Sequence, residues 1–178
     1  MALLIAPSQP DIPDYSHEIH TVIVDNIGRT TQQDFTAFLP TPLENVVQAR
    51  LVAATLTTTG AVTQKAIHLG IEELRTHFSQ QTQAEVNFGG DGDPSTDVKN
   101  HLNGVFGTVI GQHVALGPSS ATRVLIFRDE YPIVQCYHNP IRRLDRLTFN
   151  IDREDGTSAS LGDSVFTFRI TCRKKNLP

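Results

Sequence analysis

The sequence predicts an all-β protein, a sandwich or barrel built from about eight to ten short strands. Apolar and polar residues alternate in many short runs, which is typical of strands with one buried face. Clusters of Gly, Pro, Asp and Asn separate these runs and form turns. The 178 residues show no repeat and no change in composition that would divide the chain. We therefore expect one soluble domain with a single core.

The clearest pair of predicted strands lies near the C-terminus, at Leu147–Asp152 and Val165–Cys172. In both, apolar residues occupy every second position, so that one face is apolar and the other polar. The pairs Asp155-Gly156 and Gly162-Asp163 lie between them and indicate turns. We expect two antiparallel strands with an apolar inner face and no chemistry of their own.

The other strands are justified in the same way. Glu44–Thr58 contains alanines that also suit a helix, but its threonine-rich end and Gly60 favour a strand. Ile71, Leu74 and Phe78 have helical spacing, so a short helix within Glu72–Ser79 is an alternative there. The remaining predicted strands are His20–Asp25, Asp34–Leu39, Ala66–Ile71, Val105–Ile110, Arg123–Phe127 and Tyr131–His138.

The first segment of the chain, residues 1–16, differs from the rest. Three prolines keep it extended and irregular. Its apolar residues suit an arm that lies on another surface, and a frayed terminus is the equal alternative. These residues are Pro7, Pro10 and Pro13, and Leu3, Leu4 and Ile5. Residues 17–178 form the predicted domain.

Charge argues against a nucleic-acid coat as the main role. The net charge is −4, whereas proteins that wrap phosphate carry a dominant basic patch. The locally basic Arg173-Lys174-Lys175 is interpreted as a solubilising tail, with contact to membrane or nucleic acid left open. Cys136 and Cys172 are too few for a disulfide scaffold, and we expect buried free thiols. No signal peptide or transmembrane stretch is recognised, so we expect synthesis in a reducing cytoplasm.

No motif predicts an enzyme, a metal site or a cofactor. The seven histidines form no HExxH pattern. Asp91–Asp97 resembles the start of a calcium loop, but Lys99 intrudes and Leu102 occupies the position of the bidentate glutamate. Ser119 and Ser120 lie in no nucleophile elbow, and glycine patterns for phosphate are missing. The segment Asp91–Asp97 is interpreted as a plain surface loop.

A dense charged cluster precedes the strand at Leu147. Arg142, Arg143 and Arg146 surround Asp145 within five residues. A solvated surface is the first interpretation. In the alternative, these four residues contact a neighbouring subunit, because the planar guanidinium suits paired carboxylates.

In their order along the chain, several motifs resemble a known family. They are Pro42 to Leu56, Ile67 to Leu74, Gly104 to Ile110, Asn139 to Phe149, Asp155-Gly156 and Ser164 to Thr171. Together they resemble the single jelly-roll capsid proteins of large icosahedral double-stranded DNA viruses, which include penton and minor capsid proteins. The resemblance covers about Val22 to Cys172. It implies an eight-stranded jelly roll, two four-stranded antiparallel sheets, preceded here by an extended N-terminal arm.

The resemblance implies a structural role without catalytic residues. We expect a homopentamer at the five-fold vertices of a virion capsid, in contact with major and minor capsid proteins and assembled in the host cytoplasm. No nucleic acid is expected as a partner, and contact with an internal membrane stays open. The alternatives are a minor capsid protein, a carbohydrate- or receptor-binding jelly roll, and a metalloenzyme of the cupin kind. The last needs clustered His and Glu ligands.

Overall fold

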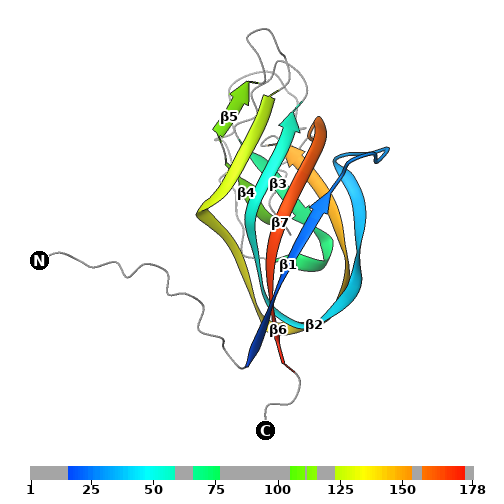
Figure 1. Cartoon of the computed structure of the whole chain (residues 1–178), viewed down its shortest axis with the longest axis vertical. Helices are drawn as coiled ribbons and strands as arrows, with labels where there is room; N and C mark the ends of the chain where they lie inside the picture. Colours follow the sequence, from blue (N-terminus) through cyan, green and yellow to red (C-terminus); the bar gives the residue numbers. More distant parts are fainter. Residues whose placement is uncertain are drawn as a thin grey trace, which may run out of the picture.

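The chain folds into an all-β structure, which confirms the predicted class. The structure is a computed structural model, and it describes residues 16–58, 66–76, 105–110, 112–115, 123–153 and 158–174. These ranges contain seven strands and one 3₁₀ turn, η1 (Figure 1). The elements are β1 His17–Asp25, β2 Asp34–Thr58, β3 Ile67–Ile71, η1 Glu72–Leu74, β4 Val105–Val109, β5 Gln112–Ala115, β6 Arg123–Arg153 and β7 Leu161–Arg173.

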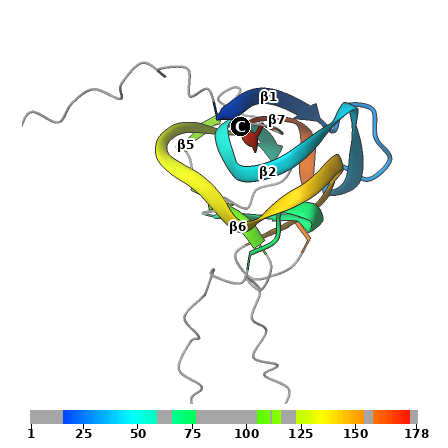
Figure 2. The same ribbon diagram turned by 90° about the horizontal axis from the view of Figure 1, so that it is seen from below.

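All strand pairs are antiparallel, in the order β1-β7-β2-β6-β3-β4, with β5 beside β6. The long strands β2 and β6 bend, and the sheet curls over on itself (Figures 1 and 2). The first part of β2, 34–44, pairs with 143–150 of β6. The second part of β2, 48–58, lies between β7 and residues 123–136 of β6.

Prolines account for the difference between many short predicted strands and two long ones. Pro40 and Pro42 lie between Phe38 and Leu43 of β2, where the register with β6 shifts. Pro140 and Pro132 of β6 lie at its two other register shifts with β2, at Val46/Gln48 and Leu51/Ala53. A proline cannot donate to the ladder, so it is tolerated where a bulge leaves residues unpaired. The prolines predict strand ends at these positions, whereas the chain only bends there.

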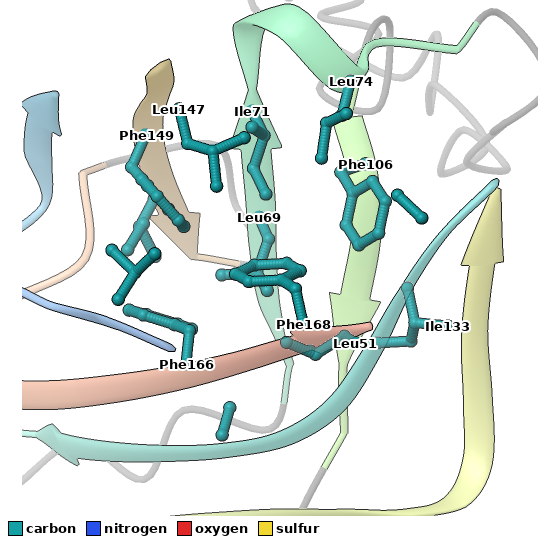
Figure 3. Close-up of a cluster of buried hydrophobic side chains, with 14 of the residues drawn as sticks. Leu51, Leu69, Ile71, Leu74, Phe106, Ile133, Leu147, Phe149, Phe166 and Phe168 are labelled. Atoms are coloured by element: carbon teal, nitrogen blue, oxygen red, sulfur yellow. The ribbon is translucent and has the colours of Figure 1, made fainter. Parts of the chain in front are cut away.

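The prediction that Leu147–Asp152 and Val165–Cys172 pair with each other is wrong. The alternation of Leu147–Asp152 and Val165–Cys172 is confirmed, because the apolar positions of both are buried. However, the two segments do not hydrogen-bond to each other. They face each other across the core, where the ring of Phe149 lies 5.3 Å from that of Phe166 and 6.0 Å from that of Phe168 (Figure 3). An apolar face alone does not distinguish neighbours in a sheet from strands packed face to face.

Two turn and helix predictions also change. Gly162 and Asp163 lie within β7 and not in a turn. A Cβ on Gly162 would lie 3.2 Å from the Cγ2 of Thr57, so glycine suits this close approach of β2. The short helix considered within Glu72–Ser79 is a 3₁₀ turn over Glu72–Leu74, with residues 77–79 outside the described part. Asp155-Gly156 lies outside it as well.

The core consists of large apolar side chains from both facing parts of the sheet. Burying each one contributes about 1.5–3 kcal/mol relative to exposure. Gly107 of β4 lets the core close tightly, because a Cβ there would overlap the Cγ2 of Ile133 on β6. The largest fully buried residues include Phe106, Phe149, Phe166, Phe168, Leu51, Leu56, Leu69, Ile71, Leu74 and Leu144.

A buried asparagine anchors the turn between β1 and β2. The Nδ2 of Asn26 donates to the carbonyls of Gln32 at 2.8 Å and Gly162 at 3.2 Å, and its Oδ1 accepts from the Ser164 N–H at 2.7 Å. Gly28 in this turn has φ +73°, a conformation that glycine adopts without strain. These bonds hold the end of β1 against β7.

Candidate interaction surfaces

The predicted contact residues Arg142, Arg143, Asp145 and Arg146 lie on β6 just after its bend, and all four are exposed. The Nε of Arg146 lies 3.2 Å from Glu73 Oε1. Glu73 has only 18% of its side chain exposed and also accepts from the Thr148 N–H at 2.7 Å and Oγ1 at 2.8 Å. Arg146 is thus joined to the fold of its own chain.

The other members of this cluster are less constrained. Arg143 Nε lies 3.5 Å from Asp145 Oδ2, and both side chains are largely in solvent. Within the described ranges Arg142 has no ion pair. Exposed pairs of this kind contribute little to stability, about 0–1 kcal/mol. A role in contact with a neighbouring subunit stays a prediction, with Arg142 and Arg143 better placed for it than Arg146.

An apolar surface follows the outer edge of the sheet at β1. The side chains of Ile19 and Ile23 are 47% and 68% exposed, on the same outward face as Thr21. Phe38 on the first part of β2 is 75% exposed. We call Ile19, Thr21, Ile23 and Phe38 the β1 edge surface. Single exposed apolar residues are normal, but a cluster of them indicates a contact site.

A groove lies between β1 and the first part of β2. Its volume is about 480 Å³, and it is open to solvent. The groove lies where the register of β2 with β6 shifts, between Phe38 and Leu43. Its walls carry both apolar and polar groups, from residues 20–25 and 37–41 together with Arg29 and Leu43.

A second apolar site lies at the other end of the strand order. Ile110, next to β4, is 68% exposed, and Val114 of β5 is 43% exposed. We call these two residues the opposite edge surface. Figure 1 shows β5 at the upper left, β1 rising from the lower centre toward the right, and the first part of β2 at the right. Within the described ranges, the exposed large apolar side chains lie on these edges and at Ile27 in the turn beside β1.

The two cysteines differ, and one prediction is wrong. Both are free, but Cys136 is exposed, whereas Cys172 is buried as expected. Cys136 lies beside the bend of β6, where Gln48 Nε2 approaches its sulfur at 3.5 Å. Burial, with the nearby Glu18 carboxylate, raises the pKa of the Cys172 thiol. Neither position has the features of an activated nucleophile.

A depression of about 480 Å³ on β2, β6 and η1 contains Asp34, Glu72 and Asp152, and Asp34 accepts from Asn150 Nδ2 at 2.8 Å. In the part of the chain that the structure describes, no three His, Cys, Asp or Glu side chains are grouped to hold a metal. Asp91–Asp97, Ser119, Ser120 and the proposed arm up to Tyr15 lie outside that part.

The comparisons with known proteins leave function to the geometry. No protein-family model matches the chain, and no curated protein matches it. No helix in the described ranges is long and apolar enough to cross a membrane. The β1 edge surface is not among the sequence-based predictions. Its one signal is that apolar residues occupy both faces of residues 19–24, a pattern that a fully buried strand also shows.

Proposed function

We propose that the fold is a single jelly roll, in which β2 and β6 each contribute two strands. Asn45 supports the division of β2, because its φ of 54° turns the backbone there. The divided segments pair in two groups of four. The first group is 17–25, 161–173, 46–58 and 123–136, and the second is 34–44, 143–153, 67–71 and 105–109. This order agrees with that of a jelly roll, which has two facing four-stranded sheets and Greek-key connections, and it supports the proposal.

We further propose that the chain is a structural capsid protein that assembles through the edges of its sandwich. Jelly rolls occur in viral capsids, lectins and cupins, so the fold alone does not select the function. The observation that carries the proposal is the exposure of large apolar residues at two opposite edges, Ile19, Ile23 and Phe38 on one and Ile110 and Val114 on the other. A subunit that packs laterally against neighbours needs apolar surface at its sides.

The proposed assembly is a homopentamer at the five-fold vertices of an icosahedral shell. Each contact in a ring is heterologous, so two different surfaces of the subunit meet. We assign the opposite edge surface and the segment with Arg142, Arg143, Asp145 and Arg146 to this contact. Major and minor capsid proteins are the further partners proposed around the ring.

Sedimentation velocity of the purified full chain tests the ring. The expected species has five times the monomer mass of 19.6 kDa. Reversing charge with R142E/R143E should weaken the ring, while R169E on β7 serves as a control outside the proposed contact. A trimer would contradict the pentamer and favour a spike-like jelly roll. A monomer at all concentrations would favour a minor capsid protein or a binding module.

A carbohydrate- or receptor-binding module is the second candidate. The groove beside the 75% exposed ring of Phe38 favours it, because sugars stack on exposed aromatic faces. Arrayed glycans distinguish the two functions. Binding that F38A removes would support the module, and an array without hits would support the capsid role.

A further inference from the structure

The outer side of β1 presents backbone groups to solvent at known positions. In the described ranges, β1 pairs only with β7. The Lys174 N–H donates to the Ser16 carbonyl at 3.0 Å, and the Asn26 N–H donates to the Ser164 carbonyl at 3.2 Å. In an antiparallel ladder, alternate residues bond to the same neighbour. The even-numbered residues of β1 therefore bond to β7. The backbone N–H and C=O groups of Ile19, Thr21 and Ile23 point the other way, in the plane of the sheet and away from β7.

The side chains on the outward face of β1 are self-complementary, because the central Ile-Thr-Ile reads the same in both directions and the ends are His17 and Asp25. Read forward they are His17, Ile19, Thr21, Ile23 and Asp25, and read backward they are Asp, Ile, Thr, Ile and His. Suppose that a second copy aligns antiparallel about a two-fold axis through Thr21. Ile19 then lies opposite Ile23 of the second copy, and His17 lies opposite Asp25 of the second copy. Apolar cross-strand pairs each contribute about 0.2–1 kcal/mol, and the His17–Asp25 pair joins an imidazole with a carboxylate acceptor.

We propose that β1 is a self-complementary contact, through which two copies of this chain join edge to edge in one continuous sheet. The three central pairs are 19 with 23, 21 with 21 and 23 with 19, and each exchanges two backbone hydrogen bonds. The contact covers the exposed isoleucines and approaches Phe38 across the groove. An uncovered apolar edge strand is otherwise a template for uncontrolled pairing.

This contact is isologous, because the same surface is used by both copies. It therefore differs from the heterologous ring contact and does not depend on it. A chain that forms only the β1 contact is a dimer, and one that forms both contacts links two rings. The occupant is a second copy and not an unrelated peptide, because the symmetric Ile-Thr-Ile and the pairing of His17 with Asp25 are what a strand offers to its own copy.

A cysteine placed on the axis tests the proposal. Thr21 of the two copies would be opposite each other at about 5.5 Å between Cα atoms, within the range for a disulfide. T21C is introduced into the full chain with C136S, because Cys136 is exposed. On mild oxidation, T21C should shift from 19.6 kDa to twice that mass on a non-reducing gel.

Matched variants distinguish this register from random collision. In I19C, the cysteines of the two copies would lie four residues apart along the ladder, about 13 Å. I19C should therefore form no disulfide between copies. In I19C/I23C each new cysteine lies opposite one of the other copy, so this variant should form the disulfide. T21P should prevent association, because the Thr21 N–H points outward and its loss spares the ladder with β7. Far-ultraviolet circular dichroism checks that T21P folds.

Three outcomes would overturn the proposal. T21C could remain at 19.6 kDa under oxidation, or I19C could link as readily as T21C. In the third outcome, T21C links only after residues 1–15 are deleted. The edge would then be covered by the N-terminal segment of the same chain and not by a second copy.

Discussion

Two regions of the molecule differ in whether their side chains find partners within the same subunit. The first is the corner where η1 meets β6, which we call the Glu73 corner. There Glu73 binds Arg146 and Thr148, and the hydroxyl of Tyr137 donates to the Leu74 carbonyl at 3.1 Å. The second is the β1 edge surface, where isoleucines and outward backbone groups have no described partner strand.

A dense run of charged residues in this chain therefore does not by itself identify side chains that lack a partner within the subunit. Arg146 at the corner pairs with the carboxylate of Glu73 in its own subunit. The sequence does not indicate this pair, because the two residues are 73 positions apart. Apolar side chains on the outer face of an edge strand have no comparable partner within the described part of their own subunit. Only another element or another molecule can cover them.

Replacing Glu73 should have the largest effect on stability. E73A leaves the Thr148 N–H and hydroxyl without their acceptor, which costs about 1–3 kcal/mol for a buried or half-buried donor. Thermal unfolding should move down by about 2–4 °C for each kcal/mol. E72A is the matched control, because Glu72 is exposed and makes only a 4.0 Å pair with Arg75. Equal melting temperatures for the two variants would show that the hydrogen bonds from Thr148 to Glu73 do not stabilise the fold.

Tyr137 predicts how stability changes at high pH. Burial and the neighbouring Cys136 raise its pKa above the ordinary 10.0, so the folded chain keeps a proton that the unfolded chain releases. This stabilisation is fully present below pH 10 and falls as pH rises further, by at most about 1.4 kcal/mol per pH unit. Urea unfolding between pH 9 and 11 should show a shallower loss in Y137F. Parallel curves for Y137F and the natural chain would contradict the assignment.

Arginine truncations sharpen the contrast within the charged segment. R146A should lower stability by about 0–1 kcal/mol, because its ion pair is half exposed. R142A should leave the free energy of unfolding unchanged and affect only association. Chemical denaturation measures the first effect, and sedimentation velocity measures the second. A larger stability loss for R142A than for R146A would reverse the assignment of the two residues.

The smallest effect concerns thiol reactivity and leaves stability unchanged. Cys136 should react with iodoacetamide in the folded chain, whereas Cys172, buried on β7 opposite Glu18 of β1, should react only when β1 opens. Mass spectrometry of digested protein locates each label, and C136S gives the background. Rapid labelling of Cys172 in the folded chain would mean that β1 is loosely held.

The sequence predicts the class of fold well because strand periodicity is a local property. The alternation at Leu147–Asp152 and Val165–Cys172 identifies their buried faces correctly. Pairing is not local: the two segments share the core but hydrogen-bond to different parts of β2. The prolines of β2 and β6 were read as strand ends, because bulges and breaks place the same demand on the backbone N–H.

The candidate contact surface was harder to predict than the fold. Ile19 and Ile23 alternate with Val22 and Val24 in a strand that looks apolar on both faces. A central strand has the same composition, and only the position of β1 at the end of the sheet exposes one face. Arg142 and Arg143 were identified from charge alone, and their role in contact stays a prediction.

Amide hydrogen exchange on β1, followed by nuclear magnetic resonance at increasing protein concentration, tests the account most directly. In dilute solution, His20 and Val22 should be protected by the ladder with β7, while Ile19, Thr21 and Ile23 exchange freely. At high concentration the odd-numbered amides should become protected as a second copy pairs with them. Odd-numbered amides that exchange freely at every concentration would contradict association through this edge, and protection that is independent of concentration would contradict it equally.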